Sequence, residues 1–99
     1  MRVRFTAGAR EEMREAHRFY EDKRKGLGRE FASEIALAVN TVREHPMRWP
    51  VLSNNVRRYL VHRFPYGIVY KTYADHVRVL AIMHLSQRPD YWKRRDVGE

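Results

Sequence analysis

The sequence predicts a small α+β domain in which a helical hairpin packs on one face of a mostly antiparallel, four-stranded sheet. Two consecutive segments have the three- and four-residue apolar spacing of amphipathic helices. Three consecutive segments then have the composition of β-strands. Because helices and strands are grouped rather than alternating, the class is α+β, in the order β-α-α-β-β-β.

A short strand followed by a helix is expected at the start of the sequence. Val3 and Phe5 flank an arginine, which is typical of a strand, and the Thr6 hydroxyl can cap the helix that follows. Apolar residues then repeat along one helical face, at Ala9, Met13, Ala16 and Tyr20. The basic, glycine-containing run 23–28 ends this helix.

A second helix and a loop are expected next. The apolar stripe of this helix consists of Leu27, Phe31, Ile35, Ala38 and Val42. The helix ends at His45, because the residue before a proline resists helical angles. Residues 47–55 contain Pro50 and two asparagines and are predicted to form a loop that Trp49 anchors on the core.

The rest of the chain predicts three strands, at residues 58–64, 66–73 and 77–85, and then a basic tail at residues 88–95. The last strand is almost continuously apolar, so we expect it to be central, with at least one face covered. The first strand, at residues 3–5, is expected to return to the sheet beside this last strand. The sheet face opposite the hairpin is expected to be partly open and to form the natural binding surface.

Composition narrows the class of protein and of partner. The chain has 99 residues, the length of a single domain, and a net charge of +8 with an isoelectric point near 10.3. This charge favours an anionic partner such as nucleic acid, a ribosome or an acidic protein. Cysteine is absent, which excludes disulfides, cysteine zinc sites and thiol catalysis. No segment has the length of a secretory leader or a membrane span, so we expect a cytoplasmic protein with no membrane partner.

Several short motifs stand in a distinctive order along residues 3–95. They are Phe19-Tyr20-Glu21, Gly26-Leu27-Gly28, Trp49-Pro50, Phe64-Pro65-Tyr66, Val69-Tyr70, His84 and Arg88-Pro89-Asp90-Tyr91-Trp92. In this order and spacing they resemble the RelE/ParE superfamily of bacterial toxins. The resemblance implies the toxin of a type II toxin–antitoxin module, which inhibits growth and serves plasmid stabilization. It also implies a hetero-oligomer with a cognate antitoxin, whose acidic, partly disordered segment covers a basic groove of the toxin.

The resemblance is compatible with two activities, because RelE-like and ParE-like toxins share the fold. RelE-like toxins cleave messenger RNA on the ribosome, and for that activity His84, Arg88 and Arg63 would be the catalytic residues here. Gly67, however, stands where RelE-like nucleases carry an arginine. Their lysine-rich stretch ahead of the second strand is also missing here, because Asn54, Asn55 and Val56 occupy that region. We therefore favour a ParE-like action on DNA gyrase. A ribosome-dependent nuclease and an inactive binding module stay as alternatives.

The basic sheet face and the C-terminal tail are expected to contact the target or the antitoxin. The predicted contact residues are Arg57, Arg58, Arg63, Tyr66, Arg88, Tyr91, Trp92, Lys93 and Arg94. Purely structural roles are the alternative: a solvated sheet edge for the arginines, a hydrogen-bonded strand end for His84, and a pinned tail for Tyr91 and Trp92. No metal or cofactor is expected, because the five histidines lack the spacing of metal ligands.

Overall fold

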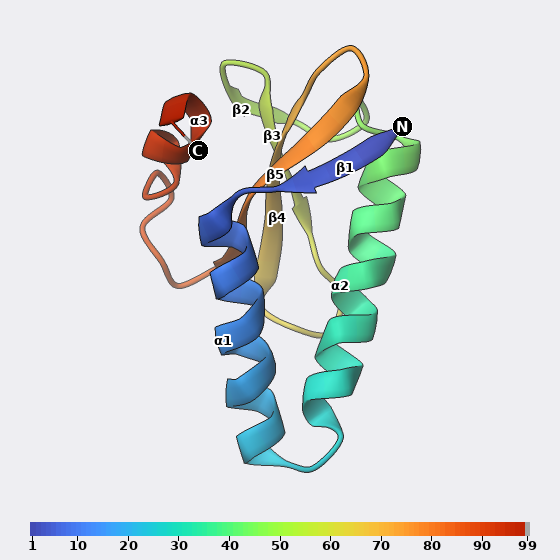
Figure 1. Ribbon diagram of the computed structural model, residues 1–99, viewed down its shortest axis with the longest axis vertical. Coiled ribbons are helices and arrows are strands. Elements are labelled where there is room, and N and C mark those ends of the chain that lie inside the picture. The colour runs from blue at the N-terminus through green and yellow to red at the C-terminus, as the bar shows by residue number, and fades with distance from the viewer. Residues whose placement is uncertain (99) are drawn as a thin grey trace.

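The computed structural model describes residues 1–98, and the side chains of residues 1–96. Its elements are β1 (Arg2–Phe5), α1 (Ala7–Lys23), α2 (Leu27–Glu44), β2 (Val51–Ser53), β3 (Val56–Leu60), β4 (Tyr66–Thr72), β5 (His76–His84) and α3 (Lys93–Gly98). The α+β class and the helical hairpin are thereby confirmed (Figure 1). Over residues 1–98, no helix has the length and apolar character needed to cross a membrane.

The strands of the described residues form one sheet in the order β1-β5-β4-β3-β2. β1 runs parallel to β5, with Val3 opposite Val77 and Phe5 opposite Val79, and the other neighbouring strands are antiparallel. The prediction that the first strand lies beside the last is therefore confirmed. β5 lies between β1 and β4, and its residues from Val79 to Met83 are all buried, as its apolar run predicts.

Three segments differ from the prediction. Residues 51–53, predicted as loop, form the edge strand β2, so the sheet has five strands rather than four. Asn54 and Asn55 have φ angles of 46° and 64°, and this left-handed pair turns β2 directly into β3. The strand predicted to reach residue 64 ends at Leu60, and Arg63 has a φ of 74° that a strand cannot contain. The predicted tail includes the start of the short helix α3.

Hydrogen bonds at both ends of α1 fix the helical hairpin. The Thr6 hydroxyl accepts from the Ala9 N–H at 3.1 Å, which confirms the predicted cap. At the other end, the Glu21 carboxylate accepts from the N–H groups of Gly26 and Gly28, each at 3.0 Å. The bond from Gly26 is the main cause that holds the pKa of Glu21 below its usual value. The turn into α2 is thus stabilised by the Glu21 carboxylate as well as by glycine.

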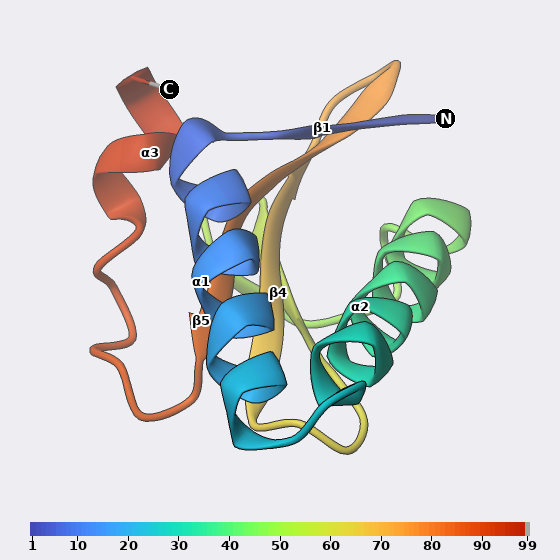
Figure 2. The ribbon, with the colours of Figure 1, turned by 60° about the horizontal axis from the view of Figure 1, so that its bottom comes forward.

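Apolar residues form a core on each face of the sheet. On the hairpin face, Phe31 is fully buried, and its ring centroid lies 5.1 Å from that of Tyr20 and 5.2 Å from that of Phe64. On the opposite face, Trp92 is only 2% exposed and packs with Val56, Val69, Leu80, Ala81 and Met83. α2 and α3 accordingly lie on opposite sides of the sheet (Figure 2). The face expected to be partly open is therefore partly covered by the C-terminal segment.

Two tyrosines of β4 make the stability of the fold sensitive to alkaline pH. Burial raises the pKa of Tyr66 and of Tyr70 from 10.0 to about 12, so the folded state favours the neutral phenols. Their stabilising contribution is complete below pH 10 and is lost as the pH rises toward about 12. We expect the free energy of unfolding, measured in urea, to fall across this interval. Tyr66→Phe should make the free energy of unfolding fall less steeply with pH. An unchanged dependence on pH would contradict the raised pKa of Tyr66 as a cause.

Candidate functional site

A cleft of about 870 Å³ lies between α1, the end of β5 and the segment that leads into α3. Figure 2 shows this C-terminal segment running beside α1. The cleft brings together three of the predicted site residues, Tyr66, His84 and Tyr91. Its other lining residues are Gly8, Glu11, Glu12, Glu15, Ala16, Arg18, Phe19, Asp22, Ile82, Ser86, Gln87 and Arg95.

The floor of the cleft is the part of β5 that β1 does not cover. β1 pairs only with residues 76–79, so the backbone groups beyond them need other partners on this side. The Thr6 hydroxyl donates to the Leu80 carbonyl at 3.0 Å. The Glu12 carboxylate accepts from the Ile82 N–H, also at 3.0 Å. Side chains, rather than another strand, therefore close this edge of the sheet.

Glu12 also holds the C-terminal segment against α1. Its carboxylate accepts from the Tyr91 hydroxyl at 2.6 Å and from the Arg95 guanidinium at 2.8 Å. Burial, reinforced by the bond to Glu12, raises the pKa of the Tyr91 hydroxyl. Gly8 gives Arg95 its room, because a Cβ atom at Gly8 would lie 2.5 Å from Arg95 Cζ. We did not predict this cluster, since nothing in the sequence separates Glu12 from the other carboxylates of α1.

Removing the Glu12 carboxylate is expected to loosen the C-terminal segment. Glu12→Ala leaves the Ile82 N–H, the Tyr91 hydroxyl and Arg95 without their shared acceptor. We expect the free energy of unfolding in urea to drop by about 2–4 kcal/mol, and amide exchange at Ile82 to accelerate. The matched control is Glu15→Ala, on the exposed face of the same helix, which should change little. Equal effects of the two substitutions would contradict this role.

His84 lies in the cleft without a cluster of cations around it. Its ring packs edge-on against Tyr66 with the centroids 5.0 Å apart, and Nδ1 accepts from the Ser86 N–H at 3.0 Å. The charged residues that line the cleft are Glu11, Glu12, Glu15, Asp22, Arg18 and Arg95, so carboxylates outnumber guanidinium groups. The lining of the cleft around His84 therefore carries more negative than positive charge. His84 itself lies at the end of β5 and is hydrogen-bonded through Nδ1.

Two of the predicted arginines are engaged in contacts within the fold. Arg63 pairs with Glu30 of α2 at 2.7 Å, and this bond raises the pKa of Arg63 and lowers the pKa of Glu30. Arg57 donates to the carbonyls of Met47 and Trp49 and so ties the loop after α2 to β3. Neither guanidinium lines the cleft that contains His84. The structure therefore does not assemble Arg63 with His84 into one catalytic site.

The side chain of Arg58 packs against a glycine of the neighbouring strand. A Cβ atom at Gly67 of the neighbouring strand would lie 3.1 Å from Arg58 Cγ and 3.2 Å from Arg58 Cδ. The glycine that departs from the RelE-like pattern therefore makes room in this chain for the alkyl part of Arg58.

The remaining predicted contact residues divide into exposed and buried ones. Arg88, Lys93 and Arg94 are exposed and free to meet a partner surface. Tyr66 is 8% exposed and Trp92 2% exposed, so both pack within the cores instead of standing on the surface. The tail thus combines an anchor, Trp92, with exposed cations on either side of it.

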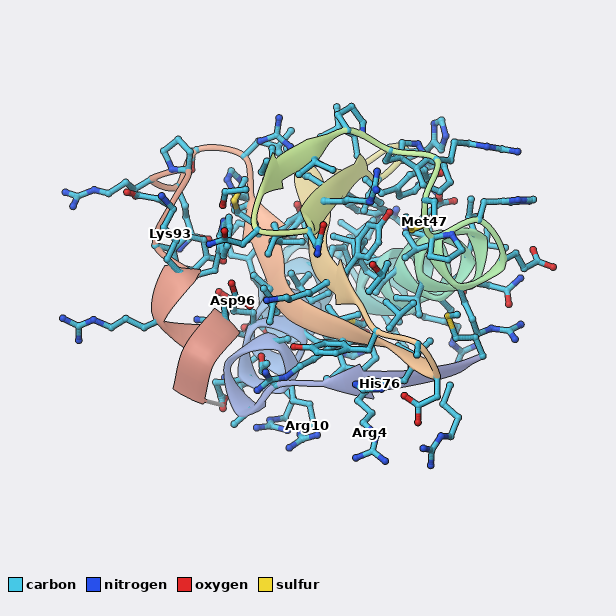
Figure 3. All side chains as sticks on the ribbon, turned by 90° about the horizontal axis from the view of Figure 1, so that it is seen from above. Arg4, Arg10, Met47, His76, Lys93 and Asp96 are labelled. Atoms are coloured by element: carbon cyan, nitrogen blue, oxygen red, sulfur yellow. The ribbon has the colours of Figure 1, made fainter. Side chains whose placement is uncertain are left out.

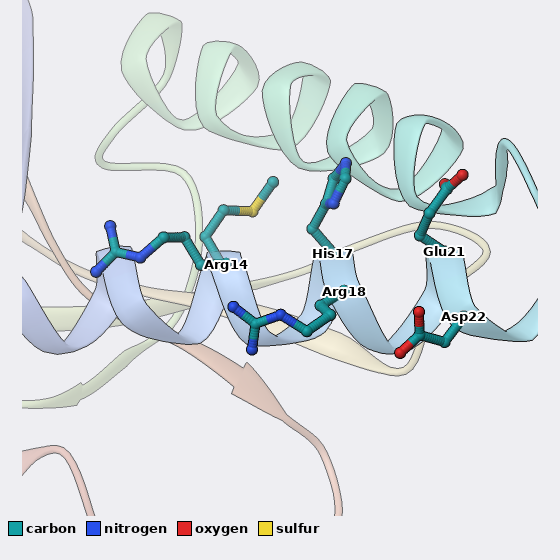
Figure 4. A pocket seen from close by; sticks show the side chains of 6 residues that line it. Arg14, His17, Arg18, Glu21 and Asp22 are labelled. Atoms are coloured by element: carbon teal, nitrogen blue, oxygen red, sulfur yellow. The ribbon is translucent and has the colours of Figure 1, made fainter.

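A second hollow, of about 490 Å³, runs along α1 and contains none of the predicted site residues. Its lining residues are Met13, Arg14, His17, Arg18, Glu21 and Asp22, and their charges are of both signs (Figure 4). Such a mixture on one helix is typical of a solvated face. Across the described part of the chain, no three histidine, aspartate or glutamate side chains are grouped so that they could hold a metal ion.

The helical hairpin, the parallel pairing of β1 with β5 and the covering C-terminal segment together define a small α+β fold. The family model described as the ParE toxin of the type II toxin–antitoxin system, parDE, matches residues 3–89, and the chain belongs to this family. A solved structure from the chromosomal ParDE TA system of P. aeruginosa has the same fold, with a TM-score of 0.77 and 14% identity. The similarity covers 87% of this chain and 97% of that one. None of the curated proteins compared with the chain matches it.

Proposed function

We propose that this ParE-family toxin inhibits growth by acting on DNA gyrase in the cytoplasm, through binding rather than through RNA cleavage. One observation carries the proposal: Arg63 and His84, two of the three residues predicted for a RelE-like nuclease, do not line the same cleft. His84 lies in a cleft rich in carboxylates, whereas Arg63 is paired with Glu30 elsewhere. Stabilising the transition state of phosphate cleavage needs cations at the reacting group, so this arrangement favours a binding mechanism.

The exposed cations of the C-terminal segment support a contact surface for the target. Arg88 and Arg94 are both exposed, on the two sides of the buried Trp92. Trp92 and the bonds of Glu12 hold this segment in place, so its cations are presented on an ordered backbone. A pre-organised surface of this kind binds with a smaller entropy cost than a flexible tail.

A cognate antitoxin is the second partner of the proposed module. The net charge of +8 suits an antitoxin segment that is acidic and partly disordered and that folds on binding. Their hetero-oligomer would keep the toxin inactive, which is how such a module can stabilise a plasmid. The first check is whether a small acidic protein is encoded immediately beside this chain; if the pairing is right, co-expression of that protein should restore growth.

Purified gyrase provides the direct test. The chain is added to gyrase, ATP and relaxed plasmid, and supercoiled and cleaved DNA are separated on gels. We expect supercoiling to be inhibited and Arg88→Glu/Arg94→Glu to raise the inhibitory concentration at least about tenfold. The control is Lys25→Glu/Arg29→Glu, which changes the net charge equally at the far end of the hairpin (Figure 1).

Pulse labelling in cells separates the two candidate targets. The chain is induced alone, and incorporation of labelled thymidine and labelled methionine is followed over the first minutes. We expect thymidine incorporation to fall first. An earlier fall in methionine incorporation, together with cleavage of ribosome-bound transcripts, would replace gyrase by the ribosome as the target.

A further inference from the structure

Basic residues form a row across three neighbouring strands at the end of the sheet next to α3. Arg4 of β1 stands directly opposite Arg78 of β5, and Arg78 stands directly opposite Lys71 of β4. Residues that are directly opposite in neighbouring strands project from the same face, so the three cationic side chains are neighbours. None of these residues belongs to the contact surface predicted from the sequence, because their alignment depends on the strand register.

The row keeps two cations without a partner of opposite charge. Lys71 is paired with Asp96 of α3 at 3.0 Å, and Figure 3 shows Asp96 on the side of α3 that faces the sheet. Among the described side chains, no ion pair or hydrogen bond involves the guanidinium group of Arg4 or of Arg78. Like charges directly opposite in a sheet are destabilising. The pairing of Arg4 with Arg78 therefore calls for a physical reason.

Protection of the sheet edge explains only part of the row. β1 is an edge strand, and charged side chains on such a strand discourage pairing with other chains. That reason accounts for Arg4 but not for Arg78, which lies on β5 between two other strands. An anion bound by both guanidinium groups would relieve their mutual repulsion.

Two further arginines flank the row and widen the positive surface. Arg2 precedes Arg4 by two residues in β1 and stands opposite His76, and its ion pair with Asp75 joins two largely exposed side chains at 3.5 Å. Arg10 Nη1 donates to the Phe5 carbonyl at 3.0 Å, which holds Arg10 beside the end of β1. In Figure 3, Arg4 and Arg10 extend from the same side of the molecule. The first turn of α1 adds no acidic residue to this surface.

We propose that Arg4 and Arg78, flanked by Arg2 and Arg10, bind the phosphate backbone of duplex DNA. Guanidinium groups bind phosphate through two parallel hydrogen bonds, and a sheet holds them at a fixed spacing that suits a regular backbone. A single strand would instead need open aromatic faces on which bases stack. The nearby Tyr73 ring is stacked on His76, with the centroids 4.6 Å apart and the planes 4° from parallel. The inference goes beyond the proposed function, because DNA binding can be measured without gyrase.

Fluorescence anisotropy of a labelled short DNA duplex, titrated with the full chain at several salt concentrations, tests the proposal. We expect Arg4→Glu/Arg78→Glu to weaken binding at least about tenfold and to reduce the salt slope, d log K/d log[salt], by about 2. The neutral pair Arg4→Gln/Arg78→Gln should weaken binding less, and it should keep or raise the unfolding midpoint of the parent chain because it removes the opposed like charges. Lys25→Glu/Arg29→Glu carries the same change of net charge and should retain most of the affinity.

Two kinds of outcome would overturn the proposal. An equal loss in both charge-reversed pairs would mean that net charge alone attracts DNA. Tighter binding of single-stranded RNA, or of an acidic peptide that competes at Arg4 and Arg78, would assign the row to that partner instead. Loss of DNA binding with unchanged gyrase inhibition would separate this surface from the target contact, whereas retained DNA binding without gyrase inhibition would contradict only the proposed target.

Discussion

Trp92→Ala is expected to lower the free energy of unfolding by about 3–5 kcal/mol and to release the C-terminal segment from the sheet. Trp92 is 2% exposed and fills the core on the face opposite the hairpin, among side chains of β3, β4 and β5. An alanine leaves a cavity that this thin layer can close only by moving the segment. Because Arg88 and Arg94 lie on either side of Trp92, the contact surface proposed for gyrase should be lost together with the packing.

The measurement is equilibrium unfolding in urea, combined with tryptophan fluorescence. The chain has two tryptophans, so Trp49 remains as the fluorescent reporter of unfolding in every variant at position 92. Trp92→Phe is the matched control: it keeps an aromatic ring and removes an indole N–H that has no hydrogen-bond partner among the described residues. Trp92→Phe should lower the free energy of unfolding much less than Trp92→Ala does. If Trp92→Ala lowered the free energy of unfolding no more than Trp92→Phe, the packing of Trp92 would not be what holds the C-terminal segment on the sheet.

Gly28→Ala is expected to destabilise the hairpin by about 1–3 kcal/mol, although alanine is ordinarily the better helix former. A Cβ atom at Gly28 would lie 2.8 Å from the His17 carbonyl oxygen and 2.9 Å from Glu21 Oε1. The first of these atoms belongs to the backbone of α1, so α1 and α2 would have to move apart. The same movement would stretch the hydrogen bond from the Gly28 N–H to Glu21, which is 3.0 Å long.

Ser33→Ala is the control for the propensity of α2, because Ser33 is exposed on the same helix and alanine meets no neighbour there. It should be neutral or slightly stabilising. The comparison is made by thermal unfolding followed by circular dichroism. A gain of stability in Gly28→Ala would show that the two helices can separate at no cost.

The types of the main elements could be predicted because each has a periodic pattern of its own. The stripe through Phe31 and the continuous apolar run of β5 both report buried faces, and the structure buries both. The edge strand β2 was missed because it is three residues long, too short for any period. Asn54-Asn55 did carry a signal, since two asparagines tolerate the left-handed conformation that a tight hairpin turn requires.

The candidate site was less predictable than the fold. Residue type alone points to His84, Tyr66 and Tyr91 as site residues, and the cleft brings the three together. The sequence does not point to Glu12, because the groups that hydrogen-bond to its carboxylate lie 70 to 83 residues away in the sequence. In the same way, the pairing of Arg4 with Arg78 follows from the register of two strands. Composition and local spacing contain neither piece of information.

The parallel pairing of β1 with β5 also sets the order in which the molecule can form during its synthesis. Thr6 bonds to Leu80 across 74 residues, and β1 has no strand beside it until residues 76–79 have left the ribosome. Until then, the helical hairpin has only part of the surface on which it packs. Contacts between such distant residues also slow folding. We therefore expect a nascent chain to stay inactive for most of its translation, and any product cut short before β5 to lack the proposed toxicity.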